Sequence, residues 1–366
     1  MEGVDPVNGD RHPPGIVSAL MRIQMPRRYL FLCPDRRTAS GGIAVIYDTV
    51  VTLRRLGYDA AVVHNSANAG YPDYADAPQL FYTLEWRKVW ASGIGVRAGL
   101  RERCRLLIER FRGGHLSRLD LRPSDVIVTP EYMLAETMGA FPEQEIGVFV
   151  QNPFSFQKAH AHALSQGNDI RKRAKWFIGV SGVCHDQFDL LGIREAHHLP
   201  VSMKPEEFPF GAEKDDLITY MPRKRPVEAK LIVEALSGRG HIGGYRIEPL
   251  ENLPRAEIAA RLRRSRFFIS LQKAESIGFP AAEAMAAGCI VVGYTGLGGR
   301  EYFTDELGIP VTEDDTAGLV RALEMAVAEY ATDPTRLDDM RTRASAEINR
   351  RFSRVAFDEA LRAVWK

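Results

Sequence analysis

Glu275 and Glu283 frame a loop whose residue types suit the binding of a phosphorylated sugar. An ionised carboxylate accepts hydrogen bonds through two oxygens, so it can hold the two neighbouring hydroxyls of a ribose. The loop runs into a predicted helix, whose first backbone N–H groups have no partner inside the helix and attract anions. We therefore expect Glu283 to bind a ribose and the loop backbone to bind phosphates. The loop residues are Ser276, Ile277, Gly278 and Phe279.

A simpler interpretation of both glutamates stays open. Glu283 is expected in the first turn of the helix, where a carboxylate also complements the positive end of the helix dipole. Glu275 could be a solvated loop residue. A binding role and these local roles are both compatible with the residues alone.

Three consecutive basic residues, Arg223, Lys224 and Arg225, offer a second way to bind phosphate. They follow a strand predicted at 217–221 and precede a helix predicted at 227–236. The planar guanidinium of arginine and the compact ammonium of lysine both bind anionic oxygens. An exposed basic loop is the alternative, and the choice among the three side chains stays open.

A strand, a loop, a helix and a second strand must position the two glutamates. Apolar runs at 266–271 and 289–294 predict the strands. Pro280 suits the first helical position, and Gly288 suits the left-handed residue that ends a helix. This order is one unit of a parallel α/β sheet, in which ligands bind where strands end and helices begin.

The first part of the chain repeats this order. Strands predicted at 28–34 and 60–64 flank a helix at 43–56, which follows Gly41 and Gly42. The glycines do not form a GxGxxG pattern and no acidic residue follows the second strand, so a dinucleotide site is not indicated. The glycine pair could simply ease a tight turn.

Polar side chains stand at the ends of two further strands, predicted at 125–129 and 146–152. Glu131 and Tyr132 follow the first strand, and Gln151 and Asn152 end the second. The carboxyl ends of parallel strands meet at one edge of a sheet. We therefore expect these side chains to enter the cleft and to contact a sugar or an acceptor.

The composition is that of an ordinary globular protein. Of 366 residues 45% are hydrophobic, and the net charge is +1, so no strong overall field favours nucleic acid. No apolar run approaches the roughly 18 residues of a membrane span. Residues 1–25 are expected to form a loose polar tail without a signal peptide. The four cysteines lack metal-site spacing, and we expect a cytoplasmic protein.

An arginine-rich segment covers residues 97–122, and apolar residues recur in it at helical spacing. This pattern predicts a basic amphipathic helix. A solvated helix face is one interpretation. The other is contact with an anionic membrane surface, at the inner face of the membrane, or with a phosphate-linked lipid acceptor.

The stretch Glu-Ser-Ile-Gly-Phe-Pro-Ala-Ala-Glu-Ala-Met-Ala-Ala-Gly, at 275–288, resembles the signature of retaining GT-B glycosyltransferases. Glycosyltransferase family 4, also called glycosyl transferases group 1, is the group that it is most similar to. In that family the second glutamate, here Glu283, holds the ribose of the nucleotide. The first, here Glu275, lies beside the donor sugar.

The resemblance also implies roles for other candidate residues. An arginine and a lysine neutralise the leaving diphosphate in the family, and Arg223 and Lys224 stand at that place. A Gly-Gly loop, here Gly41 and Gly42, faces the diphosphate across the cleft. Many members place a histidine where this chain has Gln151 and Asn152, so the sugar contacts depart from the family pattern at that point.

The fold that the resemblance implies is α/β, with two Rossmann-like domains facing each other across a cleft. The N-terminal, acceptor domain would span 26–200, and the C-terminal, donor domain would span 201–350. The segment 351–366 would be a helix that crosses back to the N-terminal domain.

The implied activity is that of a hexosyltransferase-type glycosyltransferase. It would move a sugar from a nucleotide diphosphate sugar to a hydroxyl of a glycan, polysaccharide or lipid-linked acceptor, with retention at the anomeric carbon. No metal or other cofactor is expected, and the chain has no Asp-x-Asp motif. A GT-B epimerase or hydrolase and a non-catalytic partner subunit are the alternatives. The sugar, the base and the acceptor are not specified.

Overall fold

The structure is a computed structural model that describes residues 27–35, 41–71, 74–82 and 116–365. Within these ranges all strands pair in parallel, in two separate sheets. The predicted α/β class is confirmed. The predicted tail at 1–25 lies outside the described residues, as does most of the arginine-rich segment at 97–122.

The first sheet has the strand order β4-β3-β2-β1-β5-β6-β7-β8. Its strands are β1 (Arg28–Leu32), β2 (Asp59–His64), β3 (Gln79–Phe81), β4 (Ser117–Arg118), β5 (Val126–Pro130), β6 (Glu145–Val150), β7 (Trp176–Gly179) and β8 (Ala196–His198). The order changes direction between β1 and β5, and such a switch opens a crevice outside the carboxyl ends of the strands. The helices of this domain are α1 (Gly41–Arg55), α4 (Leu134–Ala140), α5 (Pro153–Ser165), α6 (Ile170–Arg173) and α7 (Gly182–Leu190), with the short turn η2 (Glu131–Met133).

The second sheet has the order β10-β9-β11-β12-β13. Its strands are β9 (Asp215–Tyr220), β10 (Arg246–Pro249), β11 (Ser265–Leu271), β12 (Ile290–Tyr294) and β13 (Ile309–Val311). The helical elements are η4 (Pro222–Lys224), α8 (Pro226–Arg239), α9 (Arg255–Arg264), α10 (Phe279–Ala286), η5 (Gly298–Glu301), α11 (Thr316–Thr332) and α12 (Thr335–Arg351). The turn η3 (Pro205–Glu207) lies in the segment that joins the two sheets.

Successive side chains along β11 point to opposite faces of the second sheet, and both faces are covered by helices. Phe267 and Ile269 pack into one hydrophobic core, together with α8 and α11. Phe268 points to the opposite face, into a core that includes residues of α9 and α10. Both faces of the strand thus pack into hydrophobic cores, and the loop at its carboxyl end carries the polar residues that face the cleft.

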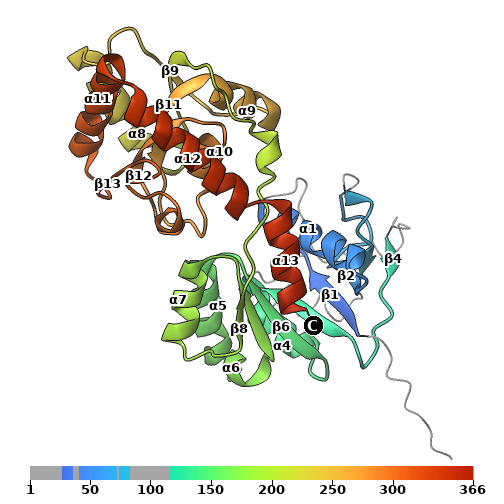
Figure 1. Ribbon diagram of the computed structural model, residues 1–366. Helices are drawn as coiled ribbons and strands as arrows, with labels where there is room; N and C mark the ends of the chain where they lie inside the picture. Colours follow the sequence, from blue (N-terminus) through green and yellow to red (C-terminus); the bar gives the residue numbers. More distant parts are fainter. Residues whose placement is uncertain (1–26, 36–40, 72–73, 83–115, 366) are drawn as a thin grey trace, which may run out of the picture.

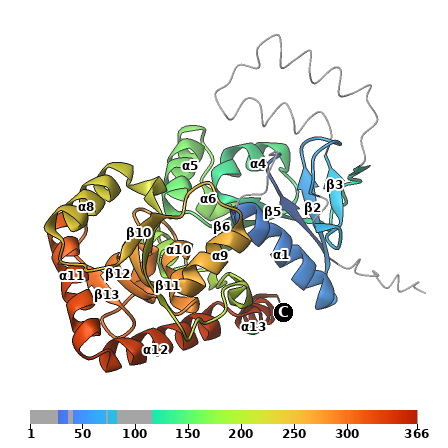
Figure 2. The same ribbon diagram turned by 90° about the horizontal axis from the view of Figure 1, so that it is seen from above.

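The last helix, α13 (Arg354–Val364), lies against the first sheet's domain although it follows the second sheet in sequence. It contacts α1, and Figures 1 and 2 both show the two helices as neighbours. The indole of Trp365 packs among the rings of Tyr29, Phe31 and Trp176, with centroids 5.9–6.3 Å apart. This aromatic contact fixes the end of the chain to the N-terminal domain.

Candidate active site

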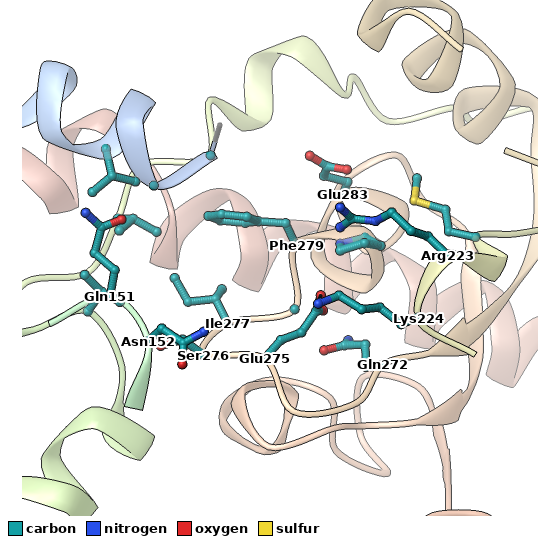
Figure 3. A pocket seen from close by; sticks show the side chains of 18 of the residues that line it. Gln151, Asn152, Arg223, Lys224, Gln272, Glu275, Ser276, Ile277, Phe279 and Glu283 are labelled. Atoms are coloured by element: carbon teal, nitrogen blue, oxygen red, sulfur yellow. Dashed lines mark ion pairs between the residues drawn. The ribbon is translucent and has the colours of Figure 1, made fainter. Parts of the chain in front are cut away.

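The carboxyl ends of the strands of both sheets border a single cleft of about 800 Å³. This volume lies within the usual range for sites that bind small organic ligands. All of the candidate residues from the sequence except Arg225 line this cleft. They are Gly41, Gly42, Tyr132, Gln151, Asn152, Arg223, Lys224, Glu275, Ser276, Ile277, Gly278, Phe279 and Glu283. Figure 3 shows the side chains of the labelled residues converging from the two domains.

The loop between β11 and α10 has a backbone that only glycine permits. Gly278 has φ +78°, and an added Cβ there would lie 1.5 Å from Oε1 of Gln272. The hydroxyl of Tyr302 donates to the Gly278 carbonyl at 2.6 Å. A Cβ on Gly298 of the neighbouring loop would lie 2.1 Å from the carbonyl oxygen of Ser276. Two loops are thus packed backbone against backbone, and this fixes the N-terminus of α10 at the cleft.

Glu283 lies in the second turn of α10 and not in the first, which corrects the prediction. The helix begins at Phe279, with Pro280 as its second residue and Gly278 as its cap. The effect of a helix dipole falls off within the first turn, so the alternative role for Glu283 loses its basis. The carboxylate pairs with the guanidinium of Arg255 at 2.8 Å. Burial raises the pKa of Glu283, and Arg255 opposes that rise.

The three consecutive basic residues separate into two groups. Arg223 and Lys224 line the cleft, where the ammonium of Lys224 lies 3.2 Å from Glu275. Arg225 is buried on another side, where it pairs with Glu228, Glu313 and Asp314 and donates from Nε to the Gln272 carbonyl at 3.0 Å. A ligand in the cleft can therefore meet Arg223 and Lys224, whereas Arg225 supports the wall behind them.

Gly41 and Gly42 form the first turn of α1 and do not precede it. Neither is among the described glycines with positive φ, so their backbone conformation by itself does not require glycine. A Cβ on Gly42 would lie 2.9 Å from Oε1 of Gln151, whereas a Cβ on Gly41 would meet nothing within 4 Å. Gly42 therefore makes room for the Gln151 amide, and Gly41 leaves open space.

The polar residues predicted for the acceptor side have different surroundings. The side-chain oxygen of Asn152 caps α5, because it accepts from the backbone N–H groups of Phe154 at 3.0 Å and Ser155 at 3.1 Å. Tyr132 is 41% exposed at the mouth of the cleft. Gln151 lies opposite Gly42. The side-chain oxygen of Asn152 thus has a structural role as a helix cap, in addition to the ligand contact expected from the sequence.

Ser276 connects the loop of the second domain to the first domain. Its hydroxyl lies 2.8 Å from the hydroxyl of Ser181, which precedes α7, and 3.4 Å from Sγ of Cys184. All three residues are buried. The side chain of Ser276 is therefore occupied by a contact between domains, and only its backbone remains for a phosphate.

Several cleft residues were not named as candidates from the sequence. Gln272 follows β11 and is buried, and its Oε1 has no hydrogen-bond partner. Asn252 follows β10 with a left-handed φ of +55°. Glu131, in contrast, was expected at the end of a strand together with Tyr132, and it also lines the cleft. Among the described residues, no three His, Cys, Asp or Glu side chains form a cluster that could hold a metal ion.

Glu131 has an unusual environment for a carboxylate. It is only 4% exposed, and its Oε2 accepts from the backbone N–H of Gln151 at 3.1 Å. Burial raises the pKa of Glu131 to about 7, although hydrogen bonds from backbone N–H groups oppose the rise. The folded protein therefore binds the Glu131 proton more tightly than the unfolded chain, for which the ordinary pKa is 4.5.

This raised pKa predicts a pH-dependent stability. The contribution of Glu131 should be fully present below about pH 4.5 and should be lost as the pH rises through about 7. The total loss should be about 3 kcal/mol, at 1.36 kcal/mol per pKa unit. Glu131→Gln should lack this dependence. Urea unfolding of both proteins across this pH range measures it, and parallel curves for the two would contradict the assigned environment.

Comparisons with known proteins agree with this arrangement. Residues 223–356 match the protein family described as glycosyl transferase-like. An alpha-1,6-glucosyltransferase of Actinobacillus pleuropneumoniae serotype 7 (strain AP76) is 23% identical over 320 residues, which are 82% of this chain and 84% of that protein. No helix within the described ranges is both long enough and apolar enough to cross a membrane.

Solved structures resemble the whole arrangement of domains. HepE from Anabaena, in complex with UDP and glucose, superposes with a TM-score of 0.62 at 13% identity, covering 92% of this chain and 98% of HepE. TarM of S. aureus, in a complex that includes UDP, superposes with a TM-score of 0.63 at 7% identity, covering 93% of this chain and 99% of TarM. These likenesses confirm the GT-B fold, with two Rossmann-like domains on either side of a cleft.

Proposed function

We propose that this chain is a retaining glycosyltransferase of glycosyltransferase family 4, which transfers a sugar from a nucleotide diphosphate sugar to an acceptor hydroxyl without a metal ion. The observation that carries the proposal is the set of chemical groups that line the cleft. It combines two cationic side chains, a helix N-terminus and two carboxylates, which are the groups that a diphosphate, a ribose and a sugar require. The glycosyl transferase-like match over 223–356 and the glucosyltransferase relative support the reaction class.

In the proposed reaction, the bond between the anomeric carbon and the diphosphate oxygen breaks, and the diphosphate leaves with the electron pair. The acceptor oxygen forms the new bond on the same face of the sugar, and its proton passes to the departing diphosphate oxygen. Arg223 and Lys224 stabilise the charge that develops on the leaving diphosphate. The backbone of 276–279 binds the phosphates, Glu275 contacts the donor sugar, and Glu283 holds the ribose. Gln151, Asn152 and Tyr132 face the acceptor.

Two further features of the proposal follow from the cleft walls. Gly41 and Gly42 let the donor diphosphate approach the N-terminal domain closely, since neither residue places a side chain of its own between α1 and the cleft. UDP is the first nucleotide to test, because HepE and TarM were both crystallised with it.

Calorimetric binding of UDP, GDP, dTDP and ADP tests the donor site. We expect one nucleotide to bind in the presence of a chelator, and Glu283→Ala to weaken that binding at least about tenfold, or about 1.4 kcal/mol. The reason is that alanine removes both acceptors for the ribose hydroxyls. Glu257→Ala is the matched control, because Glu257 pairs with Arg261 on α9 and does not line the cleft.

Failure of all four nucleotides to bind at about millimolar concentration would overturn the donor site and favour a non-catalytic partner subunit. Product analysis without an acceptor addresses the other alternative. An epimerase converts the sugar nucleotide at full rate when no acceptor is present, whereas a transferase turns over slowly.

A further inference from the structure

Arg255 is an arginine in an unfavourable local position. It is the first residue of α9, where the helix dipole disfavours a positive charge by roughly 0.3–1 kcal/mol. A residue that contradicts the local preference is commonly retained for a contact made by the tertiary structure. The partners of Arg255 identify that contact.

The guanidinium of Arg255 joins Glu283 to the segment between the two domains. One nitrogen donates to Glu283 at 2.8 Å, another donates to the carbonyl of Met203 at 3.2 Å, and Nε pairs with Glu207 at 2.5 Å. The guanidinium also stacks over the ring of Phe208, 4.7 Å from its centroid. Four contacts hold a side chain that is 52% exposed, so the orientation of the guanidinium is fixed although it is not buried.

The same segment continues into the N-terminal domain. Lys204, which has a left-handed φ of +53°, places its ammonium 3.8 Å from Asp48 of α1. The backbone N–H of Met203 donates to the Phe352 carbonyl at 3.3 Å, just before α13. The ion pairs therefore run from the proposed ribose carboxylate, through Arg255 and the interdomain segment, to the helix that begins with Gly41.

We propose that Arg255 is a positioning residue for the donor ribose: it holds the Glu283 carboxylate charged and oriented toward the two ribose hydroxyls, and it ties that carboxylate to the interdomain segment through Glu207. This inference rests on the proposed function, because it needs a nucleotide in the cleft. The group that Arg255 recognises is the Glu283 carboxylate, and the ligand group that depends on it is the vicinal diol of the nucleotide. Arg255 does not line the cleft and touches no reacting atom.

A buried carboxylate without a cationic partner tends to take up a proton, and a protonated carboxyl accepts fewer hydrogen bonds. The negative charge of Glu207 also favours protonation of Glu283. Removing Arg255 should therefore weaken binding of the ribose diol more than it changes any other part of the site. Comparing the affinities of nucleotides with and without the ribose hydroxyls isolates this effect.

The experiment compares UDP with 2′,3′-dideoxy-UDP by calorimetry, or the matching pair if another diphosphate is the one that binds. We expect wild type to favour the ribose form by about tenfold or more, and Arg255→Met to lower this preference to about twofold or less. In steady-state assays the same variant should raise the KM for the donor with little change in kcat. Arg255→Lys should recover part of the preference, since it restores the charge without the planar fork.

Arg261→Met is the control, because Arg261 lies on the same helix and pairs with Glu248 and Glu257 away from the cleft. Glu207→Gln keeps the Arg255–Glu283 pair but loosens the interdomain end, and we expect an intermediate loss of preference. Glu207→Gln also tests the inference if Arg255→Met does not fold. A full ribose preference in Arg255→Met, or in Glu207→Gln and Arg255→Lys together, would overturn the inference. Failure of wild type to bind any nucleotide would overturn the proposed function instead.

Discussion

Lys224→Ala should lower kcat by about 100- to 1,000-fold, with a smaller effect on the KM for the donor. The ammonium of Lys224 lies at the end of β9 and η4, beside Glu275 and in the same cleft as the N-terminus of α10. In the proposed reaction, negative charge accumulates on the departing diphosphate, and a fixed cation stabilises the transition state more than the ground state. Steady-state kinetics with the sugar form of the nucleotide that binds, and with an acceptor, measures the effect.

Lys230→Ala is the control for this prediction. Lys230 lies on the neighbouring helix α8, pairs with Glu234 and is 76% exposed. Its removal should leave kcat unchanged. Lys224→Arg should keep part of the activity, because it retains the charge in a different shape. A Lys224→Ala enzyme with kcat within about threefold of wild type would show that this cation does not act on the leaving group.

Arg225→Met should lower the free energy of unfolding by about 2–4 kcal/mol, although Arg225 is adjacent to Lys224 in the sequence. Its guanidinium is only 2% exposed, pairs with three carboxylates and lies 4.7 Å from the centre of the Tyr294 ring. Methionine fills similar space but leaves those carboxylates and the Gln272 carbonyl without their donor. Because Asp314 is 76% exposed, its carboxylate regains water, which keeps the loss below that of a fully buried pair.

Urea unfolding at neutral pH measures this loss. The matched control is Arg239→Met at the other end of α8, where a half-exposed arginine pairs with Glu324. A surface pair of this kind contributes about 1 kcal/mol or less. Equal stability of Arg225→Met and wild type would mean that the buried ion cluster contributes nothing to the fold.

Lys224→Ala and Arg225→Met separate a catalytic role from a structural role, whereas the sequence alone predicted one basic loop that binds phosphate. Consecutive residues in η4 and after it point in different directions, so Lys224 reaches the cleft and Arg225 reaches the loop at 313–314. Two of the three carboxylate partners of Arg225, Glu313 and Asp314, are 88 and 89 positions away along the chain. No local pattern contains that information, which is why the choice among Arg223, Lys224 and Arg225 was open before the structure.

The sequence by itself determined the α/β class and the order of the strands around the central loop. It also identified the candidate residues, such as Glu275, Glu283 and Lys224, that line the cleft in the structure. Apolar runs separated by helical periodicity specify buried parallel strands, and in such sheets the carboxyl ends of the strands are where polar side chains gather. Glycines at positive φ, such as Gly278 and Gly288, are also local requirements that the sequence carries directly.

Only the tertiary structure decided which polar side chains meet. Glu283 meets Arg255, 28 positions away, and Ser276 meets Ser181, 95 positions away. The burial of Glu131 and the capping of α5 by the side-chain oxygen of Asn152 also depend on the tertiary structure. Periodicity records which face of an element is buried, but the partner of a polar group depends on how distant elements pack. The side chains that hold the site in place are therefore defined by the packing of distant elements, within each domain and, for Ser276 and Ser181, between the two domains.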